Sequence, residues 1–187
     1  MRIPAWPEGH GRTILEEATS TQDLARAEAR AGRAGPLWIM ARRQTAGRGR
    51  RGRVWTAPPG NLSCTVMLRP AAPAKVAAGY GFVAALAMAE LVEAAAPRAR
   101  VEIKWPNDVV LDGGKVSGVL LESEGAGARI DWLAIGIGVN LAAHPPADPE
   151  GALAPTSLAA AGVAPPAPED ALTVLAAAFA RHAARFE

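Results

Sequence analysis

The sequence predicts a single domain, residues 1–187, that combines helices with β-strands. A chain of 187 residues, half of them apolar, is long enough to bury one substantial core. Short alternating or apolar runs bounded by glycine, proline and asparagine are typical of strands, and longer runs with apolar residues three or four positions apart are typical of helices. The strand-like runs are residues 13–17, 36–40, 61–68, 101–104, 109–111, 115–121 and 129–140, and the helix-like runs are residues 20–32, 74–96, 157–161 and 169–186.

The first helix pattern begins directly after a strand pattern. Ser20 is a natural N-cap residue, and Asp23 follows it by three positions. The pair Ser20-Thr21 therefore lies at a strand-to-helix junction, where hydroxyl groups and free backbone N–H groups are suited to a polar ligand. A plain helix cap is the alternative interpretation.

Residues 42–55 carry six arginines and three glycines directly after an apolar strand pattern. Glycines at 47, 49 and 52 allow close approach of the backbone to a ligand, and the guanidinium groups between them offer forked donors for carboxylate or phosphate oxygens. The stretch therefore predicts a loop that surrounds an anion. A solvated basic loop and an arginine- and glycine-rich nucleic-acid arm are the alternatives.

Charge and composition narrow the function classes. The net charge is only +2, and no aromatic residue precedes Trp55 in the arginine stretch, which disfavours a nucleic-acid binder. Cys64 is the only cysteine and the N-terminus lacks an apolar signal core, so we expect a cytoplasmic protein. The three histidines are scattered, which indicates no structural zinc site. The uninterrupted apolar part of residues 74–96 is too short to span a bilayer, so we expect a core helix with Val76, Tyr80, Val83, Ala87 and Leu91 inward and no membrane partner.

Residues 109–121 contain two strands joined by a tight turn at 112–114. Residues 105–108, Trp-Pro-Asn-Asp, end the preceding strand, and Asn107 and Asp108 are also ordinary turn residues. Lysine occurs only at 75, 104 and 115 in a chain rich in arginine, which indicates that a compact ammonium group is wanted at Lys104 and Lys115. Simple alternation puts Lys115, Ser117 and Val119 on one face, with Gly118 leaving space beside the backbone.

The last third of the chain begins with a strand whose glycines, Gly136 and Gly138, fall on one face. A flat group such as a purine fits against bare backbone there, and a close helix crossing explains the pattern equally well. The proline-rich residues after Leu141 predict a mobile surface connection, and a final helix follows.

Taken together, four motifs resemble the catalytic domain of biotin protein ligases. They are Ser20-Thr21; Gln44 with residues 47–53 and Trp55; residues 104–108 with Lys115 and Gly118; and residues 136–140. The resemblance implies a fold similar to the class II aminoacyl-tRNA synthetase core, an α+β fold with a mixed, largely antiparallel sheet and helices packed on it. It also implies activation of biotin by ATP to biotinyl-5'-AMP, then transfer to a lysine of a biotin carboxyl carrier protein such as that of acetyl-CoA carboxylase.

The chemistry of the residues agrees with the resemblance, because an anionic nucleophile that approaches a polyanion needs cations around it. Arg48, Arg50 and Lys115 are the expected catalytic residues. The expected biotin-binding residues are Ser20, Thr21, Gln22, Gln44, Arg48, Gly49, Arg50, Lys115 and Gly118. The expected ATP-binding residues are Arg50, Arg51, Trp55, Lys104, Asn107, Asp108, Lys115 and Asn140, with Asp108 also expected at Mg²⁺.

The sequence also departs from the family. Gln22 stands where the family often has asparagine, and we expect neither a helix-turn-helix before Ser20 nor the family's small C-terminal β-barrel. Without that barrel, Leu172, Phe179 and Phe186 of the last helix are expected to be exposed. A homodimer is one expected assembly. The remaining alternatives are a lipoate ligase, which shares the adenylate chemistry, a biotin-binding protein that has lost transfer, and the nucleic-acid binder.

Overall fold

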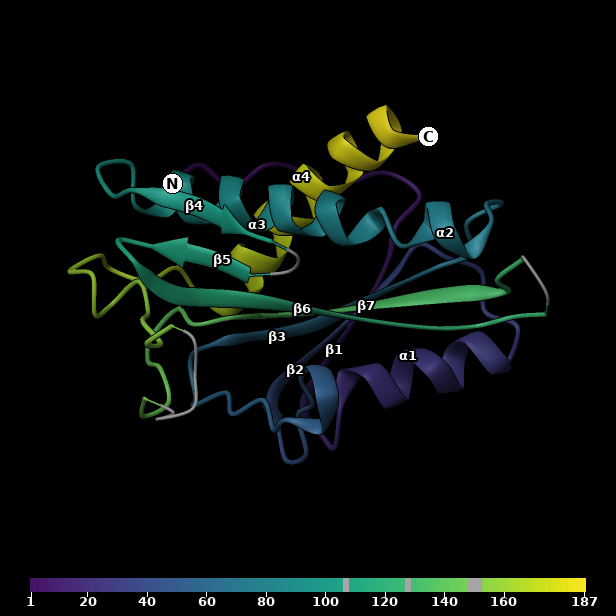
Figure 1. Cartoon of the computed structure of the whole chain (residues 1–187), viewed down its shortest axis with the longest axis horizontal. Coiled ribbons are helices and arrows are strands. Elements are labelled where there is room, and N and C mark those ends of the chain that lie inside the picture. Colours follow the sequence, from purple (N-terminus) through teal and green to yellow (C-terminus); the bar gives the residue numbers. More distant parts are fainter. Residues whose placement is uncertain (106–107, 127–128, 148–152) are drawn as a thin grey trace.

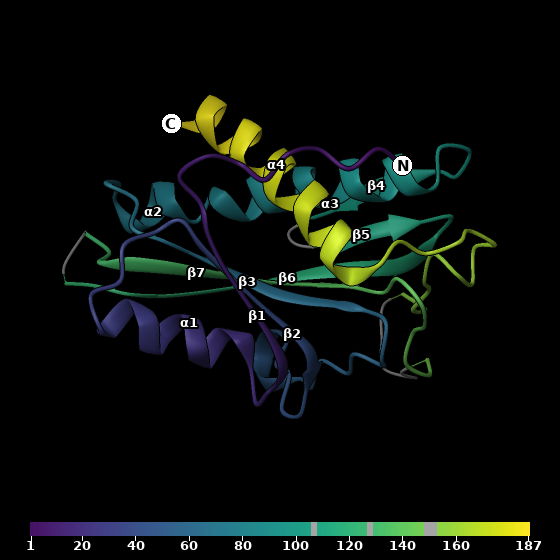
Figure 2. The same cartoon turned by 180° about the vertical axis from the view of Figure 1, so that it is seen from behind.

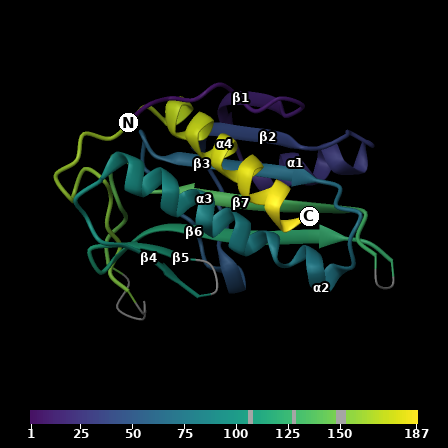
Figure 3. The same ribbon diagram turned by 90° about the horizontal axis from the view of Figure 1, so that it is seen from above.

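The computed structural model of the chain describes residues 1–105, 108–126, 129–147 and 153–187. Within these residues, seven strands form one sheet in the order β1-β2-β3-β7-β6-β5-β4 (Figures 1 and 3). The strands are β1 (Gly11–Ala18), β2 (Leu37–Gln44), β3 (Leu62–Leu68), β4 (Val101–Lys104), β5 (Asp108–Leu111), β6 (Gly114–Glu124) and β7 (Trp132–Val139). The helices are α1 (Thr21–Arg30), α2 (Ala74–Ala77), α3 (Tyr80–Ala95) and α4 (Pro168–Phe186), with a short 3₁₀ turn at Arg50–Gly52.

The sheet is mixed and largely antiparallel. Only β1 and β2 run parallel, and every other neighbouring pair is antiparallel. Helices α3 and α4 lie side by side over one face of the sheet, and α1 lies on the opposite face (Figures 1 and 2). This arrangement confirms the predicted fold class.

The main core lies between the sheet and the pair α3–α4. Trp38, Met88, Leu91, Ile135 and Phe179 are among its fully buried side chains. One described stretch, Ala74–Ala95, is long and apolar enough to cross a membrane by length and composition, and 61% of its most apolar window is buried inside the molecule. Because α3 is covered by both the sheet and α4, its apolar character serves the core.

The helix predicted over residues 74–96 is interrupted. It forms α2 and α3, and Gly79 between them touches the end of α4, where an added Cβ would lie 2.5 Å from Phe186 Cζ. Val76, predicted as a core residue, is 49% exposed, and its neighbour Ala77 is the buried residue of α2. Tyr80, Val83, Ala87 and Leu91 are buried as predicted.

The final helix buries most of its apolar face. Leu172 and Phe179 are fully enclosed by α3 and the sheet, so the prediction that they are exposed was wrong, and only Phe186 is 40% exposed. The predicted short helix at residues 157–161 was also wrong. Residues 158–162 form turns, in which the Ser157 hydroxyl accepts the N–H of Ala160.

Two further differences from the prediction concern strand β2, which runs into the arginine stretch, and strand β6, which carries Lys115. Strand β2 continues to Gln44, so Arg42 and Arg43 lie on the strand, where they pair with Glu16, Glu169 and Glu17 instead of facing the loop. In β6, Lys115 pairs with Val110 and Ser117 pairs with Val109, which leaves Val116 as the extra residue of a bulge.

The bulge changes the face to which Lys115 belongs. Val116, Ser117 and Val119 face the core on the α3 side, where the Ser117 hydroxyl donates to Gly138 O at 2.8 Å. An added Cβ on Gly118 would lie 3.5 Å from Lys115 Nζ, so Lys115 shares the opposite face with Gly118. The prediction that Lys115, Ser117 and Val119 share a face was therefore wrong.

At the far end of α1, Arg69 ties three chain segments together. Its guanidinium donates to the carbonyl oxygens of Ala29, Arg33 and Asp131. Arg69→Met should remove these bonds at the helix C-terminus and lower stability by about 1–2 kcal/mol, or about 3–6 °C in Tm. Thermal unfolding followed by circular dichroism measures the change. The exposed Arg98→Met is the control, and an equal Tm for the two variants would contradict the role given to Arg69.

Candidate functional site

A cavity of about 480 Å³ opens on the α1 side of the sheet. Every predicted site residue in the described part of the chain lines it, and Asn107 lies outside the described residues. The predicted residues on its wall are Ser20, Thr21, Gln22, Gln44, Arg48, Gly49, Arg50, Arg51, Trp55, Lys104, Asp108, Lys115, Gly118 and Asn140. The structure thus brings four motifs, distant in sequence, to one place, while their individual roles stay predictions.

One end of the cavity is built where β1 and β2 finish. Because the two strands are parallel and Ala18 pairs with Gln44, the start of α1 and the end of β2 meet. Gln44 Oε1 accepts the backbone N–H of Thr21 at 2.8 Å and the Thr21 hydroxyl at 3.1 Å. Gln44 therefore caps α1 from another strand, and the expected side-chain cap by Ser20 is not formed.

Gln22 extends this polar end toward the centre of the sheet. Its Nε2 donates to Leu120 O at 3.3 Å, and it is only 3% exposed. The Gln22 side chain packs against Gly136 of β7, where an added Cβ would lie only 3.0 Å from Gln22 Cδ. Gln22 Oε1 is buried without a hydrogen-bond partner among the described residues, so it is an acceptor available to a ligand N–H group.

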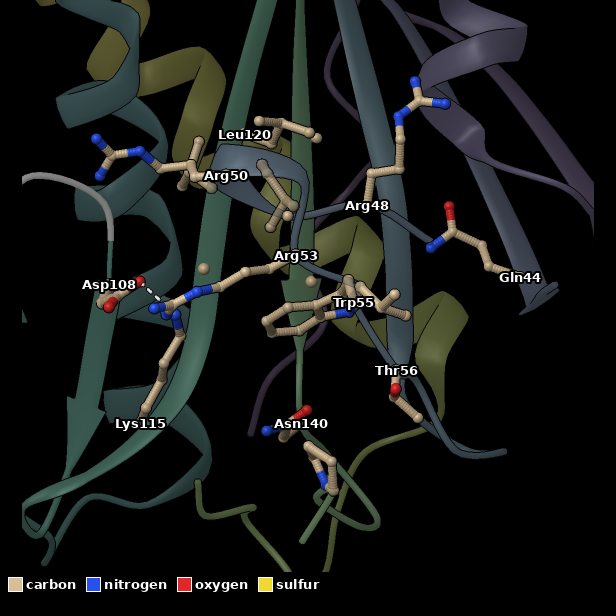
Figure 4. Close-up of a pocket in the computed structure, with 18 of the residues that line it drawn as sticks. Gln44, Arg48, Arg50, Arg53, Trp55, Thr56, Asp108, Lys115, Leu120 and Asn140 are labelled. Carbon is tan, nitrogen blue, oxygen red and sulfur yellow. Dashed lines mark ion pairs between the residues drawn. The ribbon is translucent and has the colours of Figure 1, made fainter. Parts of the chain in front are cut away.

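The other end of the cavity carries cations. Lys115 Nζ lies 2.7 Å from Asp108 Oδ1, and Lys104 also lines this end. Figure 4 shows the side chain of Arg53 directed at the Lys115–Asp108 pair. Arg53 is absent from the residues predicted for the site. Its place in the arginine stretch was the available signal, and spacing alone does not tell which arginine turns inward.

The glycine face of β7 holds a flat group that belongs to the protein. An added Cβ on Gly138 would lie 2.3 Å from Trp55 Cε2, so the Trp55 indole rests on bare backbone. Lys115 Nζ lies 6.0 Å from the centre of the same indole. In this structure the position predicted for a purine is therefore occupied at Gly138 by Trp55, and a base would have to stack against or displace the indole.

Asn140 follows β7 and closes the cation end. Its Nδ2 donates to Thr156 O at 3.0 Å, which leaves Oδ1 buried and without a partner in the described part of the chain. The residues beyond it were predicted to form a mobile surface connection. Residues 148–152 lie outside the described residues, and the described part of this segment is bonded to neighbouring strands. Thr156 N donates to Lys115 O and Leu158 N donates to Asn140 O, and Pro145, Pro146, Leu153 and Pro155 line the cavity.

The arginine loop is folded back on itself. Gly49 N donates to Arg53 O at 2.8 Å and Trp55 N donates to Gly47 O at 3.0 Å. The Arg48 guanidinium grips Asp23 of α1 through two bonds of 2.7 and 2.9 Å and lies 3.5 Å from Glu122. The hydrogen bonds from Arg48 hold the pKa of Asp23 below its usual value. Figure 4 shows Arg48 and Arg50 pointing away from Lys115, on opposite sides of the cavity.

The Cys64 thiol and the carboxylates are the remaining groups to consider for nucleophilic or metal chemistry. Burial raises the pKa of the Cys64 thiol, which lines the cavity as a neutral, apolar group. Among the described residues, no cluster of three histidine, cysteine, aspartate or glutamate side chains is arranged to hold a metal ion. The expected role of Asp108 at Mg²⁺ stays a prediction.

The Asp23–Arg48 pair should anchor the loop. Asp23→Asn removes the charge that holds Arg48, and loss of about 1 kcal/mol from this partly exposed pair should speed tryptic cleavage after Arg50 or Arg51 about fivefold. Glu28→Gln, which breaks the Arg33–Glu28 pair on the same helix, is the matched control. Time courses by mass spectrometry measure both, and equal cleavage rates would show that the pair does not anchor the loop.

Comparison with known proteins agrees with this geometry. Residues 16–140 match the Biotin/lipoate A/B protein ligase family. A biotin–[acetyl-CoA-carboxylase] ligase from Paracoccus denitrificans is 49% identical over 159 residues, which are 83% of this chain and 66% of the relative. The bifunctional ligase/repressor BirA of Bacillus subtilis is 38% identical over 108 residues, 57% of this chain and 33% of that protein. The chain thus spans two thirds or less of these relatives.

Solved structures give the same result. The biotin protein ligase of Leishmania major in complex with biotinyl-5-AMP is 32% identical and superposes with a TM-score of 0.76 over 90% of this chain and 73% of that one. The biotin protein ligase of Aquifex aeolicus in complex with biotin and ATP is 27% identical, with a TM-score of 0.75 over 94% and 71% of the two chains. The resemblance found in the sequence motifs is therefore confirmed, and this chain belongs to the Biotin/lipoate A/B protein ligase family.

Proposed function

We propose that this chain joins biotin to ATP as biotinyl-5'-AMP and then transfers the biotin to a lysine of a biotin carboxyl carrier protein. The observation that carries the proposal is the layout of the cavity. Two acceptors on its wall are buried and have no hydrogen-bond partner among the described residues: Gln22 Oε1 beside α1 and Asn140 Oδ1 beside the cations. Biotin has ureido N–H groups and adenine has an exocyclic amino group, and each supplies the donor that one of these acceptors lacks.

In the first step, a carboxylate oxygen of biotin attacks the α-phosphorus of ATP, and the bond from that phosphorus to the pyrophosphate oxygen breaks. Both reactants are anions, so cations must neutralise them and hold them in line. Lys115, with Arg53 directed at it, lies where the charge of the transition state would grow. Lys104 would hold pyrophosphate oxygens, and Mg²⁺ would arrive with ATP and neutralise its phosphates next to Asp108.

In the second step, the neutral ε-amine of the acceptor lysine attacks the acyl carbon of biotinyl-5'-AMP. The bond from that carbon to the phosphate oxygen breaks, AMP leaves, and the amine loses a proton as the amide forms. Until then the mixed anhydride must be kept from water. The arginine loop, in which Arg48 pairs with Asp23 of α1, is suited to close over it.

A lipoate ligase is the second candidate within the family. The dithiolane ring of lipoate has no N–H donor and would leave Gln22 Oε1 unpaired, which favours biotin. A nucleic-acid binder is disfavoured, because Arg42, Arg43 and Arg48 are paired with carboxylates. A biotin-binding protein that has lost transfer differs from a ligase in the second step, so only a measurement of transfer to the carrier separates the two. The cytoplasmic location and a homodimer stay predictions.

Lys115→Ala should lower biotin-dependent exchange of labelled pyrophosphate into ATP about 10²–10³-fold, because one charge is removed from the growing transition-state charge. Lys75→Ala, an exposed lysine on α2, is the control and should retain wild-type exchange. The assay is run with biotin and with lipoate on the wild type first. Exchange stimulated by lipoate and not by biotin would overturn the substrate assignment, and equal rates in the two variants would overturn the role of Lys115.

The transfer step needs a separate measurement. Wild-type protein, biotin, MgATP and a carrier domain with one acceptor lysine should give a carrier whose mass rises by one biotinyl group. A carrier that stays unmodified while pyrophosphate exchange proceeds would identify the chain as an activating protein without transfer.

A further inference from the structure

We propose that Asn61 is a positioning residue for the nucleotide: it fixes the segment that carries Asn140 and the two prolines beside it. The inference rests on the proposed function, since it assigns a nucleotide to the cation end of the cavity. Asn61 lies just before β3, does not line the cavity and is 2% exposed. It therefore acts through other residues.

The side chain of Asn61 makes four hydrogen bonds to one short segment. Its Oδ1 accepts the backbone N–H groups of Leu141, Ala142 and Ala143 at 3.0, 2.9 and 3.2 Å. Its Nδ2 donates to Ala143 O at 2.8 Å. One buried amide thus satisfies four backbone groups of a turn that has no regular secondary structure of its own.

The neighbouring glycine supports the same contact. Gly60 has a φ of +85°, and an added Cβ there would lie 2.8 Å from Ala142 Cβ. The turn before β3 therefore approaches the 141–143 segment so closely that a side chain at position 60 would push it away. Two adjacent residues, Gly60 and Asn61, are both adapted to this one contact.

The segment held by Asn61 is part of the cavity wall on both sides. Asn140, directly before it, has the buried Oδ1 that would meet the amino group of adenine. Pro145 and Pro146, which follow the segment after His144, line the cavity. Further bonds continue to Lys115, because Asn140 Nδ2 donates to Thr156 O and Thr156 N donates to Lys115 O. Asn61 is thereby linked to the nucleotide end, whereas Thr21, Gln22 and Gln44 form the other end.

This division predicts an effect on one substrate only. Without Asn61, three N–H groups, one buried and two partly buried, lose their acceptor, so the 141–143 segment would move to find water or other partners. Asn140 would then present its carbonyl in a wrong direction, and ordering it again would draw on the binding energy of the nucleotide. The biotin end, capped by Gln44, would be unchanged.

The test uses Asn61→Ala, Asn61→Asp and, as a control, Arg69→Met. The control variant also loses several side-chain bonds to the backbone, here three bonds to carbonyl oxygens, but the residue lies at the far end of α1. The readouts are KM for ATP in pyrophosphate exchange, Kd for biotin by calorimetry without nucleotide, and Tm. Asn61→Ala should raise KM for ATP about tenfold while Kd for biotin stays within about twofold. Asn61→Asp keeps the acceptor oxygen and loses one donor, so KM should rise about threefold.

Arg69→Met should lower Tm and leave both constants unchanged. The proposal is overturned if Asn61→Ala lowers Tm with KM for ATP unaltered, or if ATP and biotin weaken equally. Should Asn61→Ala be insoluble, an unaltered KM in Asn61→Asp overturns it. Wild-type protein without any biotin-dependent exchange would instead refute the proposed function, so the two failures are distinguishable.

Discussion

The cavity exists because strand β7, near the middle of the sheet, carries glycine at two positions of one face. Gly136 and Gly138 leave bare backbone where any other residue would place a Cβ within 3.0 Å of Gln22 or 2.3 Å of Trp55. Neighbouring strands contribute polar side chains to the same cavity, and on β6 the Lys115 side chain lies against Gly118. A side chain at Gly138 would expel the indole, and one at Gly136 would crowd Gln22, so the other contacts of the site depend on this pair of absent side chains.

Most polar groups around the cavity have a partner within the protein, and a few buried groups are left for a ligand to bind. Gln44 and Thr21 satisfy each other, and so do Lys115 and Asp108. Among the described residues, Gln22 Oε1 and Asn140 Oδ1 are left as buried acceptors, and Trp55 Nε1 is left as a buried donor. Because an unpaired buried acceptor is costly, these two oxygens indicate the ligand chemistry more sharply than the arginines do, whose charges are partly neutralised by Asp23 and Glu122.

Periodicity was sufficient to predict the strands, the three long helices and the hairpin at Asp112 and Gly113, because each depends on local pattern and turn chemistry. Periodicity failed where a contact between residues distant in sequence determines the local structure. At the break between α2 and α3, Gly79 leaves room for the Phe186 ring of α4, and the bulge at Val116 moves Lys115 to the face of the cavity. Likewise, no local signal tells that Arg48 meets Asp23, or that the proline-rich segment is tied to Asn61 and Asn140 instead of moving freely.

The central claim is that one cavity binds biotin and nucleotide side by side. Calorimetric titration of the wild-type chain with biotin, alone and with an unreactive ATP analogue, tests it most directly. We expect saturable binding of biotin that becomes tighter when the nucleotide is present, because the two ligands share the cations around Lys115. No heat of biotin binding under either condition would contradict the account, and a biotin affinity that stays the same with the nucleotide would contradict the proposal that the two ligands bind side by side.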